Sequence, residues 1–119
     1  MFYYKAIITE VYDGDTVTVD IDLGFNNWKK GEKLRLYGID TPELRGSELI
    51  KGREARDFVR ERVLGKEIII HTYKDKKGKY GRYLATIMYR RHPEDTDNIN
   101  LNDELVAKGM AVPYFGGTK

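Results

Sequence analysis

Four acidic residues of this 119-residue chain fall at predicted turns that flank strands. Asp13 and Asp15 enclose Gly14, and an Asp-Gly pair is typical of a tight turn between two strands. Asp40 and Glu43 enclose a Thr-Pro turn. Carboxylates held about 4 Å apart repel each other by about 4 kcal/mol at an effective dielectric constant of roughly 20, so a convergent set needs a cation or a proton. Carboxylate and carbonyl oxygens suit hard cations such as Ca²⁺, Mg²⁺ or Mn²⁺.

Two arginines could act on a phosphate ester beside these acids. Arg35 alternates with Leu34 and Leu36 on a predicted strand, and Arg82 begins the last long predicted strand. A guanidinium group can bind two phosphate oxygens at once, and its charge stabilises a phosphodiester whose negative charge increases during attack. Each acidic turn taken alone is also explained as an ordinary turn, and each arginine as a surface charge. Their joint occurrence is what indicates a site.

The charge distribution is uneven along the chain. Residues 29–91 contain 18 basic and 9 acidic residues, a net charge of +9, whereas residues 1–28 carry a net charge of −4 and residues 92–119 a net charge of −3. A basic segment of this kind suits a polyanion such as a nucleic-acid backbone, although a solubilising surface explains it equally well.

Composition excludes several classes of protein. The chain has no cysteine, which excludes a disulfide scaffold, a zinc ribbon and a thiol nucleophile. No apolar run approaches the roughly 20 residues of a membrane span. Its first residues do not resemble a signal peptide, so we expect a cytoplasmic protein unless a leader has been removed. The length suits a single domain spanning residues 1–119.

Periodicity predicts the elements that must position these side chains. Alternating or β-branched segments predict strands over residues 3–12, 16–21, 33–37, 67–73 and 82–90. Helical spacing and end signals predict helices over 52–64 and 101–108, the second with Asn100 as its N-cap. Residues 22–32 and 44–51 are expected to be loops. The order predicts an α+β, mainly β chain whose five strands could form an open sheet or a small barrel such as the OB-fold.

Three ordered motifs resemble the staphylococcal nuclease (thermonuclease-like) family. They are Val11-Tyr12-Asp13-Gly14-Asp15-Thr16-Val17, Leu34-Arg35-Leu36-Tyr37-Gly38-Ile39-Asp40-Thr41-Pro42-Glu43 and Lys79-Tyr80-Gly81-Arg82-Tyr83-Leu84-Ala85. The resemblance extends over roughly residues 4–115. It implies a five-stranded OB-fold barrel, with one helix between the third and fourth strands and a short C-terminal helix.

The resemblance also implies an activity: Ca²⁺-dependent hydrolysis of DNA and RNA by a monomer, with low sequence specificity, a preference for single strands and 3′-phosphate products. The implied metal ligands are the carboxylates of Asp15 and Asp40 and the carbonyl of Thr41, with Asp13 just outside them. The implied catalytic residues are Arg35, Glu43 and Arg82, with Glu43 as general base or water-positioning group, and the implied substrate-binding residues are Lys79, Tyr80 and Tyr114.

Two other functions remain open at this stage. A non-catalytic OB-fold module could bind nucleic acid with the same barrel. A protein-interaction domain could use the same acids only to cap turns. The presence of Asp15, Arg35, Asp40, Glu43 and Arg82 together favours the enzyme.

Overall fold

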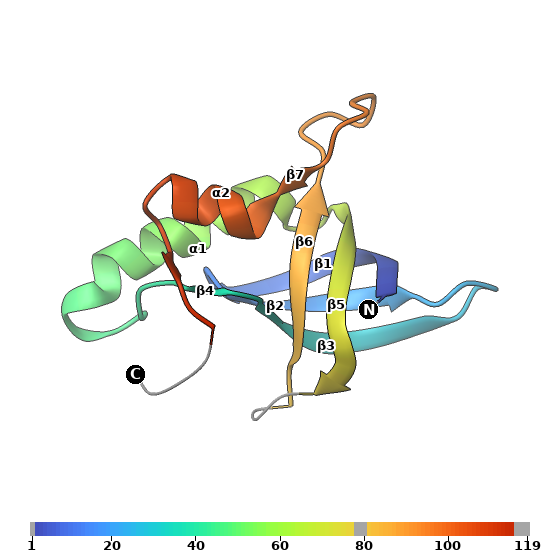
Figure 1. Ribbon diagram of the computed structural model, residues 1–119, viewed down its shortest axis with the longest axis horizontal. Coiled ribbons are helices and arrows are strands. Elements are labelled where there is room, and N and C mark those ends of the chain that lie inside the picture. The colour runs from blue at the N-terminus through green and yellow to red at the C-terminus, as the bar shows by residue number, and fades with distance from the viewer. Residues whose placement is uncertain (1, 78–80, 116–119) are drawn as a thin grey trace.

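Strand pairing in the computed structural model closes a five-stranded barrel. The model describes residues 2–77 and 81–115, without the side chains of residues 74–77. The barrel strands are β1 (Phe2–Asp13), β2 (Thr16–Asp22), β3 (Trp28–Leu36), β5 (Glu67–Lys77) and β6 (Tyr83–Tyr89). They are hydrogen-bonded in the order β3-β2-β1-β5-β6, and a parallel pairing of β3 with β6 completes the ring (Figure 1). This closed ring confirms the predicted OB-fold barrel rather than an open sheet.

Two helices and several short elements complete the fold. Helix α1 (Leu49–Val63) follows the 3₁₀ turn η1 (Gly46–Glu48) and connects β3 to β5, as predicted. The short helix α2 (Leu101–Ala107) follows β7 (Ile99–Asn100). Both helices lie on the upper side of the strands in Figure 1. The short strands β4 (Ile39–Asp40) and β8 (Val112–Pro113) pair with each other outside the barrel.

Alternating side chains build the core. In β2, Val17, Val19 and Ile21 are buried, as their spacing predicts. Helix α1 covers the barrel with Ala55, Val59 and Val63, which recur on one face of the helix and are buried. This aliphatic interior holds the strand ends, and the polar groups on them, in fixed positions.

Local signals place the ends of both helices. The Asn100 side chain accepts a hydrogen bond of 3.0 Å from the Asp103 N–H, which confirms the predicted N-cap of α2. Gly65 follows α1 with a φ of 76°, a conformation that glycine adopts without strain. Neither described helix has the length or the apolar character that a membrane crossing would need.

Two predicted loops are wrong in part. Residues 22–32 were expected to form a loop, but Asp22 pairs with Trp28 and β3 continues from there, because cross-strand hydrogen bonds form without an apolar alternation. Residues 44–51 were also expected to form a loop, but they contain η1 and the start of α1. The helix begins without a side-chain cap, so the usual start signal is missing from the sequence.

Candidate active site

An ion-pair network joins β2, β3 and β4 at one edge of the barrel. Thr16 of β2 lies opposite Arg35 of β3, so Asp15, which precedes β2, comes next to the guanidinium group. Arg35 Nη1 lies 2.5 Å from Asp15 Oδ2, and Arg35 Nη2 lies 3.3 Å from Asp40 Oδ1. Nη2 also donates a hydrogen bond of 3.1 Å to the carbonyl of Ile39. One arginine therefore connects the two predicted metal-binding carboxylates.

Asp15 is the most enclosed member of this network. It is only 5% exposed, and its Oδ2 accepts a hydrogen bond of 3.0 Å from the Thr41 N–H. Burial by itself would raise the pKa of Asp15. Hydrogen bonds from the Asp13 carboxyl group and the Thr41 N–H, together with the charge of Arg35, outweigh burial and hold this pKa below its usual range. The Asp15 carboxylate is thus charged and held in one orientation.

Asp13 differs from Asp15 although only one residue separates them. Burial, followed by the negative charge of Asp15, raises the pKa of Asp13 to about 7. Asp13 Oδ1 accepts a hydrogen bond of 3.1 Å from the Asp15 N–H. Because the two carboxyl groups repel each other when both are charged, a positive charge bound beside them would be favourable.

Arg82 reaches this network through a threonine. Arg82 Nη1 donates a hydrogen bond of 3.1 Å to Thr16 Oγ1, and that hydroxyl donates one of 3.2 Å to Asp15 Oδ1. Arg35 and Arg82 were both predicted as site residues from the sequence, whereas Thr16 was not. The available signal was its position directly after Asp15, where a side chain leaving the turn faces the same edge.

Tyr114 also lies at the site. Its ring centroid is 5.9 Å from the Arg35 guanidinium carbon, within the range of a cation–π interaction. Its backbone N–H donates a hydrogen bond of 2.8 Å to the Gly38 carbonyl, which holds the C-terminal segment against the turn after β3. The other two predicted substrate-binding residues, Lys79 and Tyr80, lie outside the described residues.

The Glu43 carboxylate is not bonded to the described members of this network. It is exposed, and its backbone N–H donates a hydrogen bond of 3.4 Å to Glu48 Oε1. No ion pair or hydrogen bond joins the Glu43 carboxylate to another described residue. The four acids also do not converge as one set, because no three Asp, Glu or His side chains in residues 2–73 and 81–115 are grouped to hold a metal ion.

The donor set nevertheless suits a hard divalent cation. Asp15 and Asp40 have carboxylate oxygens and Thr41 has a backbone carbonyl, the kinds of group that could hold such an ion together with water and substrate. The Thr41 hydroxyl oxygen is buried and has no hydrogen-bond partner among the described residues, so one more polar group would be satisfied by a ligand or water here.

Known proteins are similar to this chain over most of its length. A family model described as "Staphylococcal nuclease homologue" matches residues 33–119. The thermonuclease of Staphylococcus hyicus is 32% identical over 115 residues, which cover 94% of this chain and 59% of that protein. The thermonuclease of Staphylococcus intermedius is 27% identical over 110 residues, with coverage of 90% and 60%.

An uncharacterized protein of Methanocaldococcus jannaschii is also similar. It is 33% identical over 136 residues, which cover 95% of this chain and 60% of that protein. The chain therefore spans about 60% of the length of each of these curated relatives.

Proposed function

Because the chain belongs to the staphylococcal nuclease family, we propose that it is a Ca²⁺-dependent nuclease that hydrolyses phosphodiester bonds of DNA and RNA. The observation that carries the proposal is the network of Asp15, Arg35 and Asp40, extended to Arg82 by Thr16. The proposed enzyme acts as a monomer, prefers single strands, has low sequence specificity and leaves 3′-phosphate ends. Two thermonucleases among the relatives support the activity.

Arg35 and Arg82 are the proposed phosphate-binding groups. In its described contacts, Arg35 uses one N–H group of Nη1 and both N–H groups of Nη2. The other Nη1–H and the Nε–H can then donate to a phosphate oxygen. Arg82 is held at the same edge by Thr16. Their positive charges stabilise the transition state, in which the phosphorus is trigonal-bipyramidal and negative charge increases on the phosphate oxygens.

Glu43 is the proposed general base. Its carboxylate takes a proton from a water molecule as the water oxygen bonds to phosphorus and the bond from phosphorus to the 5′ oxygen breaks. The 5′ oxygen leaves with the fragment on its own side and takes a proton from water, and the phosphate stays on the 3′ oxygen of the other fragment. Asp15, Asp40 and the Thr41 carbonyl would hold Ca²⁺, which neutralises phosphate charge and lowers the pKa of bound water when it is present. A positioned base contributes about 10²–10⁴-fold to such a reaction.

A nuclease assay with and without free Ca²⁺ tests this function. We expect the purified protein to degrade labelled single-stranded DNA in Ca²⁺ and to stop when EGTA is added. The products should become primers for a polymerase only after phosphatase treatment, because a 3′-phosphate blocks extension. Cleavage that persists in EGTA would contradict the metal requirement, and products that are extended without phosphatase would contradict the direction of cleavage.

A non-catalytic nucleic-acid-binding module is the second candidate. The position of Glu43, exposed and unconnected to the two arginines among the described residues, favours it. In this case single-stranded DNA would bind and remain intact in Ca²⁺. The same samples therefore separate the two functions.

A further inference from the structure

Strands β1 and β5 together form one outer face of the barrel. In β5, Ile68, Ile70 and Thr72 are buried in the core, so Ile69, His71 and Tyr73 lie on the outer side. Antiparallel pairing places Tyr3 of β1 opposite His71. Lys5 and Glu67 are the charged side chains on this outer side in residues 3–7 and 67–73.

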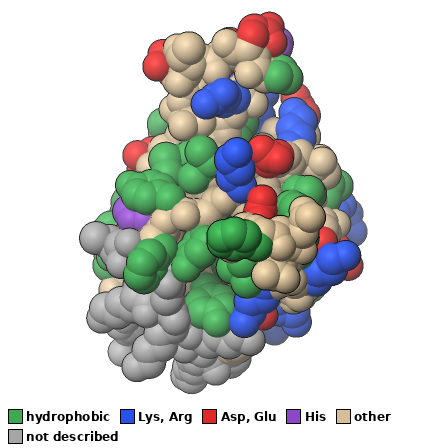
Figure 2. Space-filling model, turned by 90° about the vertical axis from the view of Figure 1, so that its right-hand side faces the viewer, with side chains coloured by type: hydrophobic (Ala, Val, Ile, Leu, Met, Phe, Trp, Pro, Cys, Tyr) green, Lys and Arg blue, Asp and Glu red, His purple; other side chains and the backbone are tan. Residues whose placement is uncertain are grey.

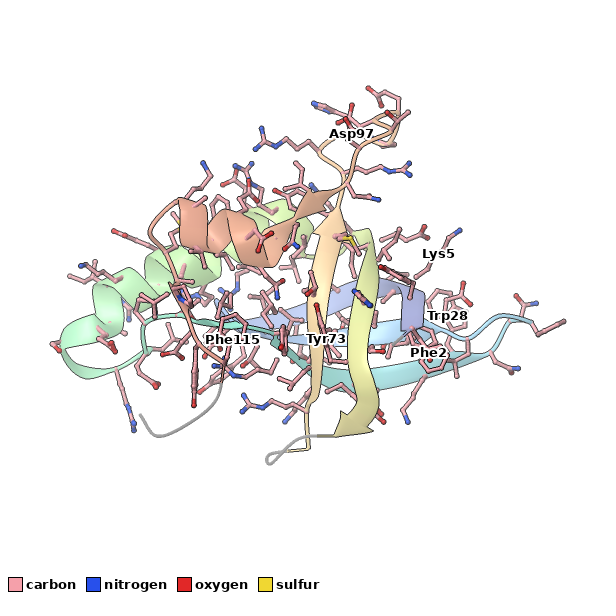
Figure 3. The ribbon with its side chains drawn as sticks, in the orientation of Figure 1. Phe2, Lys5, Trp28, Tyr73, Asp97 and Phe115 are labelled. Carbon is pink, nitrogen blue, oxygen red and sulfur yellow. The ribbon has the colours of Figure 1, made fainter. Side chains whose placement is uncertain are left out.

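Five rings form a continuous aromatic row on this face. The Tyr3 and His71 rings are stacked with centroids 4.2 Å apart, and His71 lies 5.1 Å from Tyr73. Tyr73 stacks on Tyr37 at 4.0 Å, and Tyr37 meets Phe115 edge-to-face at 5.8 Å. Figure 3 labels Tyr73 and Phe115, the two rings that contact Tyr37. The row thus joins β1, β5, the end of β3 and the C-terminal segment.

The two ends of the row are exposed to solvent. Tyr3 is 65% exposed and Phe115 is 75% exposed, while the three rings between them are half-buried. Contiguous exposed apolar surface marks interaction sites on soluble proteins. A separate group of hydrophobic side chains, with charged side chains around it, is seen from the right-hand side of Figure 1 (Figure 2).

The row begins at the candidate active site. Tyr37 follows Arg35 by two residues, and Leu84 of β6 pairs with Arg35 and is 38% exposed. Phe115 follows Tyr114, whose ring lies near the Arg35 guanidinium. An extended polymer that places one phosphate at Arg35 therefore meets the row as its neighbouring units leave the site.

We propose that the aromatic row binds the bases of a single-stranded nucleic acid that extends from the candidate active site, an inference that rests on the proposed function. Every base has a π-face, so rings bind single strands without reading their sequence. Within the row the rings stack on one another, so their edges face the solvent. A base can pack its face against these edges, and edge-to-face packing is favourable for aromatic groups. The exposed Tyr3 ring is the last ring of the aromatic row, and Lys5 lies two residues further along the same side of β1.

Continuity with the arginines favours nucleic acid over a protein partner. A protein-binding face would not need to begin beside a phosphate-binding group. After Tyr73 the sequence of β5 continues with Lys74, Asp75, Lys76 and Lys77, a basic composition that suits a polyanion.

Binding in the absence of cleavage tests the row. The affinity of labelled oligothymidylate of about 15 nucleotides, a length within reach of one OB-fold, would be measured by fluorescence anisotropy in EDTA. We expect Tyr3→Ala to weaken binding about tenfold, equivalent to about 1.4 kcal/mol. His71→Ala should weaken it similarly, with its folding checked by thermal denaturation. A thymidine dinucleotide should bind all variants equally, because it does not reach Tyr3.

Phe25→Ala is the matched control. Phe25 is fully exposed in the turn between β2 and β3 and has no ring contact with the row. Its substitution should leave the affinity unchanged. Wild-type affinity in both Tyr3→Ala and His71→Ala, or no binding of the oligonucleotide by the wild type, would overturn the proposal and leave the row to a protein partner.

The binding test of the aromatic row and the cleavage test of the proposed function can fail independently of each other. If the wild type cleaves in Ca²⁺ but the row variants bind normally in EDTA, only the row is refuted. If the wild type does not cleave but Tyr3→Ala weakens binding, the row stands and the chain is a binding module.

Discussion

Gly52 connects helix α1 to the proposed general base. It is buried in the first turn of α1, and a Cβ atom built on it would be 2.4 Å from the Glu43 carbonyl oxygen and 3.0 Å from the Pro42 carbonyl oxygen. Ordinary contacts of a Cβ atom begin at 3.4 Å. In Gly52→Ala the helix and the Glu43 backbone must therefore separate by about 1 Å, the difference between 3.4 Å and 2.4 Å.

We expect Gly52→Ala to lower kcat strongly while the protein stays folded. Alanine gains about 1 kcal/mol over glycine inside a helix, which offsets part of an overpacking cost of about 1–3 kcal/mol. The net change in the free energy of unfolding should then be at most about 2 kcal/mol. A displacement of about 1 Å of a catalytic group costs on the order of 10²-fold in rate, so kcat should fall by that factor.

The assay combines kcat on single-stranded DNA in Ca²⁺ with thermal denaturation. Lys51→Ala is the control, because Lys51 is the exposed neighbour of Gly52 in the same helix. If Gly52 acts through Glu43, Gly52→Ala should add little to the defect of Glu43→Gln. A folded Gly52→Ala protein with wild-type kcat, or a full additional loss in the Glu43→Gln background, would refute this reasoning.

Three further substitutions test the site and the fold. Glu43→Gln should lower kcat by about 10²–10⁴-fold and leave the melting temperature unchanged, because the side chain is exposed; a near wild-type kcat would remove Glu43 from the mechanism. Arg82→Ala should lower kcat by about 10²–10³-fold with little change in KM, since its contact strengthens in the transition state, and a change in KM alone would be the opposite result. Asn102→Ala should cost roughly 1–3 kcal/mol in urea unfolding, because it removes the side-chain acceptor of the buried Ile87 N–H. Exposed Asn98→Ala is its control, and equal stability of the two variants would contradict this prediction.

Asn102 shows a structural role that sequence patterns do not reveal. Its Oδ1 accepts a hydrogen bond of 3.1 Å from the Ile87 N–H, and its Nδ2 donates bonds of 2.9 Å to the Tyr37 carbonyl and 3.2 Å to the Ala85 carbonyl. The side chain therefore ties α2 to β6 and to the end of β3. A buried asparagine in a short helix resembles any surface asparagine until its partners from distant segments are known.

Most strands, the end of α1, the N-cap of α2 and the chemical groups of the site could be predicted from the sequence, whereas the starts of β3 and α1 could not. Val17, Val19 and Ile21 alternate because a strand turns successive side chains to opposite faces, and Asn100 caps α2 through an atom three residues away. These are local effects, so neighbouring residues determine them. The types of the acids and arginines also limited the chemistry to cation and phosphate binding.

Only the tertiary structure decided which of those groups meet. Register between strands and closure of the barrel bring Asp15 to Arg35, join Arg82 to them through Thr16, and stack Tyr3 on His71. The same folding leaves Glu43 exposed, with its backbone beside Gly52 and its carboxylate without an ion pair to a described arginine. Such contacts depend on hydrogen bonding and core packing between segments far apart in the chain, which no local pattern of residues encodes.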